Sequence, residues 1–137
     1  RVPAMRRRAR VMSHLAAGLF KYFDIVLATD VDEFLVVDPN VGQSLPDYLS
    51  ASKRRTSISG LGIDVGQHMQ LEQPLDLSRP FLDQRQFAHL SARYTKPNTT
   101  FRPVTWGSGM HRIKGHGFHI DPNLFLFQKH LDLNLDH

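Results

Sequence analysis

Residues 23–37 read FDIVLATDVDEFLVV, and we expect the rest of the chain to fold around this segment. The apolar run 25–28 has the length of a strand. Because it does not alternate with polar residues, it predicts a parallel strand buried on both faces. Three carboxylates follow closely, at Asp30, Asp32 and Glu33. They would lie at the carboxyl end of the strand, where open α/β sheets bind their ligands.

The carboxylates favour a site for a hard divalent cation. In extended geometry Asp30 and Asp32 share one face of the strand, whereas Glu33 points to the other. Two oxygen donors on one face, in a chain without cysteine, favour Mg²⁺ or Mn²⁺, with phosphate oxygens as the remaining ligands. The alternative is a solvated turn or helix start. Residues 34–37 weaken that alternative because they are again apolar, and buried carboxylates need a positive partner.

Composition limits the classes of protein that the chain can represent. The 137 residues include 41% hydrophobic ones, which is ordinary for a folded domain, and the absence of cysteine excludes disulfides and thiolate metal sites. No apolar run approaches the ~20 residues of a membrane span. The net charge of +4 comes largely from arginines near the start, and the charges elsewhere are mixed, which argues against a nucleic-acid surface. We expect a cytoplasmic protein without a transmembrane segment, and peripheral contact with an acidic membrane stays open through the arginines at positions 6, 7, 8 and 10.

The flanking segments supply helices and further strands. Apolar residues at three- and four-residue steps predict a helix over residues 6–23, with its arginines facing water. Ser44, Pro46 and Asp47 form a typical helix start, so a short helix should begin there and end near Lys53. Strands are expected over residues 58–65, 101–106, 115–120 and 124–127, and a further one within residues 86–96, around residues 92–94. Residues 38–42 are expected to form a turn and residues 67–83 a loop.

Glycines mark two further features. Gly60 and Gly62 lie inside a predicted strand and would let another backbone or a ligand approach closely. Residues 106–112 read WGSGMHR, which predicts a tight turn that presents His111 to a ligand. A neutral imidazole can complete an oxygen-rich metal site, and Lys96 could neutralise a diphosphate. The alternative is that His111 and Lys96 are ordinary surface side chains. The histidines that lack metal-ligand spacing are read as structural: His116, His119, His130 and His137.

Three segments resemble, in order, blocks of bacterial glycosyltransferases similar to family 2, which have the GT-A fold. They are IVLATDVDEFL at residues 25–35, YTKP at residues 94–97, and the Trp-X-X-Gly-X-His pattern at residues 106–111. The resemblance runs from about Phe23 to Phe127. It implies an α/β fold, a partial GT-A mixed sheet with flanking helices. Residues 1–137 would form a single partial glycosyltransferase domain whose upstream nucleotide-binding half is missing.

The resemblance also implies an activity, the transfer of a sugar from a nucleotide-sugar donor to a hydroxyl of a glycan or other acceptor. Asp30 would contact the nucleotide ribose or the metal, Asp32 would bind Mn²⁺ or Mg²⁺ directly, and His111 would lie near the metal and the diphosphate. The metal would act as a Lewis acid on the departing nucleoside diphosphate. A general base would assist the acceptor, and its identity is unknown. The candidates for that base are Asp64, Asp121 and Asp132.

Two departures from the family pattern bear on activity. Gln128 lies in a stretch, residues 124–132, where similar proteins tend to carry a histidine; either His130 substitutes for it or this third contact is absent. Only about one helix precedes the Asp-X-Asp segment, so we expect the chain alone to be inactive and to aggregate or melt easily. Two other functions stay open. One is a non-catalytic remnant that binds a glycan or a partner. The other is an aspartyl phosphatase, in which Asp30 would be the nucleophile and Lys96 its partner, although no later Asp-Asp pair follows.

Overall fold

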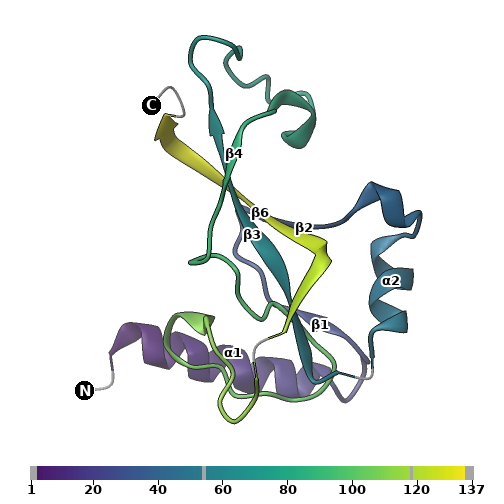
Figure 1. Ribbon diagram of the computed structural model, residues 1–137. Coiled ribbons are helices and arrows are strands. Elements are labelled where there is room, and N and C mark those ends of the chain that lie inside the picture. The colour runs from purple at the N-terminus through teal and green to yellow at the C-terminus, as the bar shows by residue number, and fades with distance from the viewer. Residues whose placement is uncertain (1–2, 54, 118, 135–137) are drawn as a thin grey trace.

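The computed structural model describes residues 3–53, 55–117 and 119–134, with side chains up to residue 128 on the last strand. This part of the chain folds into helices packed on a mixed sheet, as Figure 1 shows, so the α/β class is confirmed. The helices are α1 (Ala4–Leu19) and α2 (Leu45–Ala51). The strands are β1 (Val26–Leu27), β2 (Glu33–Val37), β3 (Ser57–Gln67), β4 (Ala88–Leu90), β5 (Thr99–Thr100) and β6 (Ile120–Asn134). Single 3-10 turns are η1 (Pro39–Val41), η2 (Leu82–Gln84) and η3 (Ser108–Met110).

Strands β3 and β6 form the long centre of the sheet (Figure 1). The strand order is β1-β5-β3-β6-β2, and β4 pairs with the far part of β3. β3 and β6 run parallel, whereas the other pairs in the described ranges are antiparallel. α1 lies across one end of this sheet, and the long connection between β3 and β4 projects from the opposite end.

The strand expected over residues 25–28 differs from its prediction. β1 pairs antiparallel with β5, Val26 lying opposite Thr100, and it stands at the end of the strand order. Val26 and Ala28 are buried, whereas Leu27 is 43% exposed, so only one face of the strand is covered. The prediction of a parallel strand buried on both faces is therefore wrong. The continuous apolar run belongs to a short edge strand instead.

Helix α1 packs inward through small side chains. Ala9, Ser13 and Ala16 are buried, at a spacing that places them on one helix face. Ala9 and Ala16 form part of a core cluster with Val104, Trp106 and Ile113. Of the helix predicted over residues 6–23, residues 6–19 are helical. The helix ends at Leu19, and Phe23 beyond it is 59% exposed. Within the described ranges, neither this helix nor another is long and apolar enough to cross a membrane.

Helix α2 follows its sequence signals closely. Ser44 is the N-cap, and its Oγ accepts a hydrogen bond from the backbone N–H of Asp47 at 3.3 Å. The helix ends at Ala51, close to the predicted end. Its buried Leu49 joins the second core cluster, which contains Ile58, Phe101 and Leu124. Local capping chemistry was therefore sufficient to place this helix.

The strand predictions had mixed success. β3 contains the strand predicted over 58–65, and β6 merges the end of the 115–120 segment with the segment 124–127. Residues 86–96 do contain a strand, β4, but it lies at Ala88–Leu90, and residues 92–94, around which it was expected, form a turn. The strand predicted over 101–106 is wrong, because β5 ends before it and Trp106 makes only an isolated bridge. Most of residues 67–83 form turns and loop, and η1 occupies the turn predicted at 38–42.

Gly62 is the position where another part of the backbone packs closely on β3. A Cβ at this residue would lie 2.5 Å from the backbone N of Thr95 and 2.6 Å from the carbonyl O of Ser91. The Gly62 N–H donates to Thr95 Oγ1 at 2.9 Å, and its carbonyl accepts from the Ser91 N–H at 2.8 Å. The predicted close approach is confirmed. It holds against the sheet the segment that leads to Lys96.

Candidate functional site

The carboxylates after β1 lie in a tight turn. The Glu33 N–H donates to the Asp30 carbonyl at 3.1 Å, and Glu33 Oε2 accepts from the Asp30 N–H at 2.8 Å. These two hydrogen bonds join both ends of the segment 30–33 and make it a turn. Strand alternation therefore does not apply here, and the expectation that Asp30 and Asp32 share one face of an extended strand is wrong.

Lys96 joins two of the carboxylates in this turn. Its Nζ lies 2.6 Å from Glu33 Oε1 and 3.3 Å from Asp30 Oδ2. The Glu33 side chain is 0% exposed and that of Lys96 is 10% exposed. A carboxylate buried to this extent needs a charged partner, and Lys96 supplies it. The alternative that Lys96 is merely a solvated surface residue is therefore wrong.

Asp30 also contacts helix α1. Arg8 pairs with Asp30 Oδ1 while Lys96 approaches Oδ2, so each carboxylate oxygen faces a cation. Partial burial raises the pKa of Asp30, but the charges and hydrogen bonds of Lys96 and Arg8 outweigh it, and the net pKa lies below its ordinary value. Asp30 is therefore ionised at neutral pH, and it ties α1 to the turn. A cavity of about 20 Å³, room for about one water molecule, lies beside Asp30.

Asp32 differs from the other two carboxylates of the turn. It is half-buried, and its Oδ2 accepts a long hydrogen bond of 3.4 Å from Gln128 Nε2. Within the described ranges Asp32 forms no ion pair. Gln128 lies opposite Glu33 in the pairing of β2 with β6, which explains how it reaches the turn. Gln128 is thus the neighbour of Asp32.

The turn that carries His111 is held in place by Trp106. The buried indole Nε1 donates to the Pro97 carbonyl at 3.1 Å, and the Trp106 N–H donates to Ser13 Oγ at 3.0 Å. Gly109 has a φ of +72°, and a Cβ there would lie 2.7 Å from the His111 ring. The predicted tight turn is confirmed, and His111 is exposed on it.

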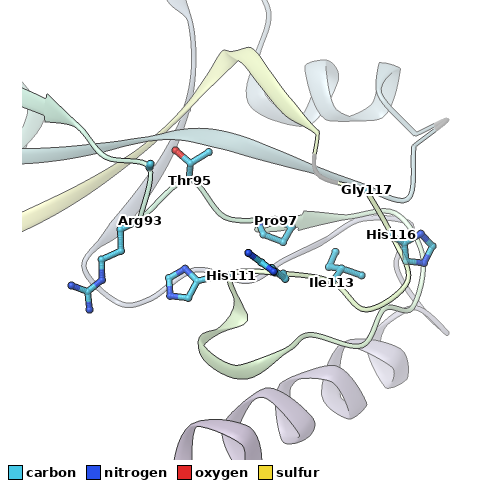
Figure 2. A pocket seen from close by; sticks show the side chains of 9 residues that line it. Arg93, Thr95, Pro97, His111, Ile113, His116 and Gly117 are labelled. Atoms are coloured by element: carbon cyan, nitrogen blue, oxygen red, sulfur yellow. The ribbon is translucent and has the colours of Figure 1, made fainter.

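His111 lines a pocket of about 550 Å³ that Figure 2 shows. In that view Arg93 and His111 lie toward one end of the pocket and His116 lies at the other. Pro97 lines both this pocket and the small cavity beside Asp30, so the two are neighbours. The lining residues are Ala92, Arg93, Thr95, Pro97, His111, Arg112, Ile113, His116 and Gly117.

The predicted metal ligands do not form one set in this structure. No three His, Asp or Glu side chains in the described part of the chain are placed to hold a metal ion together, so Asp30, Asp32 and His111 are not assembled. Both oxygens of Asp30 already face cations, whereas the only hydrogen-bond partner of the Asp32 carboxylate among the side chains that the structure describes is the Gln128 amide. A single protein carboxylate such as Asp32 fits an ion whose other ligands are substrate phosphates and water, a coordination that Mg²⁺ commonly adopts.

The three candidates for a general base have different environments. Asp121 accepts hydrogen bonds from the Tyr48 hydroxyl at 2.9 and 2.8 Å, and burial together with this contact raises the pKa of Tyr48. Asp121 therefore pins α2 to β6. Asp64 lies opposite Gln128 in the β3–β6 pairing, and its Oδ1 is buried without a hydrogen-bond partner among the described residues. The side chains of Asp132 and His130 lie outside the described part of the structure, as does His137.

Sequence reasoning missed three arginines that the structure brings to the two sites. Arg8 was grouped with the solvated arginines of its helix, and nothing in its spacing distinguishes it from Arg7 or Arg10. Arg93 and Arg112 were not singled out. A signal for them existed, since each stands beside a segment already selected, YTKP or WGSGMH.

Comparisons with known proteins give no match. No protein-family model matches the chain, and neither curated proteins nor solved structures match it. The functional assignment therefore depends on the residues of the turn and of the pocket.

Proposed function

We propose that the chain takes part in metal-dependent transfer of a sugar from a nucleotide-sugar donor to an acceptor hydroxyl. The observation that carries the proposal is the contrast within the turn 30–33. Asp30 and Glu33 are neutralised by protein cations, whereas among the described side chains Asp32 has only a neutral amide neighbour. A carboxylate held in this way is free to bind an external cation.

The charge balance of the turn supports a requirement for metal. Among the described side chains, three carboxylates and the two cations Arg8 and Lys96 leave one negative charge in excess. That excess disfavours a diphosphate on its own. A divalent ion on Asp32 would reverse the sign of the local charge, and the diphosphate of the donor would then complete the coordination of the ion. When bound, Mn²⁺ or Mg²⁺ would supply Lewis-acid stabilisation of the leaving nucleoside diphosphate.

The remaining residues of the turn would have positioning roles. Asp30 links the turn to α1 through Arg8, and Lys96 fixes the turn through its ion pair with buried Glu33. Both contacts restrict the backbone that carries Asp32, and a binding side chain on a fixed backbone loses less conformational freedom when its ligand arrives.

Calorimetry against a panel of nucleoside diphosphates, with and without Mn²⁺, tests the proposal. We expect binding only with Mn²⁺, its loss in Asp32→Asn, and its retention in the control Asp83→Asn, which changes an exposed carboxylate on η2. Equal binding by the wild type and Asp32→Asn would overturn the role of Asp32. A chain that binds no nucleotide under either condition would instead favour the glycan- or partner-binding alternative.

An aspartyl phosphatase is the second candidate, and one contact favours it. Lys96 Nζ lies 3.3 Å from Asp30 Oδ2, as the lysine of such an enzyme would have to lie beside its nucleophile. Against it, Asp30 follows a short antiparallel edge strand, and both its oxygens are paired. Beryllium fluoride, a phosphate analogue, tests this candidate: a bound fluoride signal in nuclear magnetic resonance that vanishes in Asp30→Asn would support the phosphatase.

A further inference from the structure

The pocket beside Pro97 has a chemical character that the proposed donor site does not use. Two arginines and two histidines stand on its rim: Arg93, Arg112, His111 and His116. Among its described lining residues there is no Asp or Glu. Pro97 and Ile113 are buried and give the pocket an apolar floor. A basic rim over an apolar floor is suited to an anionic ligand with a carbon framework.

The size of the pocket sets the size of that ligand. Its volume of about 550 Å³ lies within the range of about 300–1,000 Å³ of small-molecule sites. A single inorganic anion would leave most of this volume empty. A sugar ring carrying one charged group is a closer match, because its carbon face can lie on Pro97 and Ile113 while the charged group reaches the rim.

The backbone that carries the rim is fixed on both sides. The Gly107 N–H donates to the Arg112 carbonyl at 2.9 Å, and Trp106 bridges to Ile113. On the other side the Thr95 N–H donates to the Ser91 carbonyl at 3.1 Å. Arg93 lies over the ring of Tyr94, 5.9 Å from its centroid, which orders its otherwise exposed side chain. The backbone at Arg93 and Arg112 is therefore held in place, while both side chains are exposed and accessible to a ligand.

We propose that this pocket binds an anionic sugar, or a hydroxyl compound of similar size, through Arg93 and Arg112. Guanidinium groups recognise phosphate and carboxylate oxygens by paired, charge-assisted hydrogen bonds. The pocket is itself positive, so it binds this anion without metal, in contrast to the negative turn around Asp32. If the chain transfers a sugar, this ligand is the acceptor. That role rests on the proposed function, whereas the binding of an anion by the pocket does not.

The test measures binding of glucose 6-phosphate, glucuronate, glucose and inorganic phosphate by calorimetry, in a metal-free buffer of constant ionic strength. We expect Arg93→Gln and Arg112→Gln each to weaken binding of the charged sugars at least about tenfold, the loss of one hydrogen bond to a charged group. The controls Arg79→Gln and Arg102→Gln change exposed arginines outside the pocket and should alter binding less than about twofold. Because both pocket arginines are exposed, thermal melting should be unchanged in every variant.

The four ligands distinguish which charged group the pocket recognises, and the variants show whether Arg93 and Arg112 are responsible. If glucose 6-phosphate binds and glucuronate does not, the pocket is specific for sugar phosphates. If both bind, the pocket accepts a phosphate or a carboxylate on the sugar. Equal binding of neutral glucose, or of inorganic phosphate, would overturn the proposal, as would unchanged affinity in both pocket variants. Asp32→Asn should bind the charged sugars as the wild type does, because Asp32 does not line the pocket. If nucleotide binding fails while anion binding persists, only the donor proposal is lost.

Discussion

Lys96 Nζ lies 2.6 Å from Oε1 of Glu33, the first residue of β2. The Glu33 side chain has no exposed surface, so this contact is what allows a carboxylate at that point of the sheet. The same lysine reaches Asp30, and Glu33 also accepts the Asp30 N–H. A single buried cation therefore sets the shape of the turn that presents Asp32.

Replacing the lysine tests this dependence. Lys96→Met should lower the free energy of unfolding by about 3–5 kcal/mol, because it leaves Glu33 buried without its charged partner. Urea unfolding followed by circular dichroism measures the loss. The matched control Lys53→Met breaks the exposed pair with Asp24 and should cost no more than about 1 kcal/mol.

The double variant Lys96→Met/Glu33→Gln separates the charge from the packing of the lysine. It removes both charges and leaves the glutamine able to accept the Asp30 N–H. It should recover about 2 kcal/mol of the loss in Lys96→Met, because no unpaired charge stays buried. A double variant no more stable than Lys96→Met would show that the ion pair is not what holds the turn.

Acid should weaken the link between α1 and the turn. The pKa of Asp30 is lower in the folded chain than its unfolded value of about 3.9, so its stabilising contribution is complete above that value and is lost as pH falls through the folded pKa. We expect the stability difference between the wild type and Asp30→Asn to be constant near neutrality and to shrink below about pH 4. Urea unfolding of both proteins from neutral to acidic pH measures it, and parallel curves at all pH values would contradict the assignment.

The close approach at Gly62 makes it intolerant of a side chain. Gly62→Ala would place a Cβ 2.5 Å from backbone atoms of Tyr94 and Thr95, so β3 or the segment leading to Lys96 must move. We expect a loss of about 2–3 kcal/mol in thermal or urea unfolding. Gly18→Ala is the matched control: its Cβ meets nothing within 4 Å, and in a helix the change should stabilise by about 0.5 kcal/mol. Equal effects at the two positions would contradict the packing described.

Local chemistry determined which features could be predicted from sequence. The cap at Ser44 acts within a few residues, and glycines inside a strand indicate a close approach without naming the partner; both predictions hold. The sequence did not identify Ser91 and Thr95 as the residues that approach Gly62. The pairing of β1 does not depend on its own residues alone, because an apolar run fits a buried parallel strand and a one-sided antiparallel one equally well. β5 has only Thr99 and Thr100, and the sheet around it, rather than its own sequence pattern, makes it a strand.

The site was predictable in outline but not in its contacts. Burial of the carboxylates required a positive partner, and that requirement could be read from residues 30–37. Which cation meets it is decided by a fold that brings Lys96 and Arg8 to the same turn. Gln128 reaches Asp32 only through the pairing of β2 with β6. No sequence spacing encodes these distances.

Electron paramagnetic resonance of Mn²⁺ tests most directly the claim that Asp32 holds a metal together with a nucleotide. Mn²⁺ is titrated into the chain with a nucleoside diphosphate, and the free-ion signal is compared with that of nucleotide alone. We predict that the wild type removes additional free Mn²⁺, that Asp32→Asn binds it at least about tenfold more weakly, and that Asp83→Asn matches the wild type. Identical titrations for the wild type and Asp32→Asn would contradict the account.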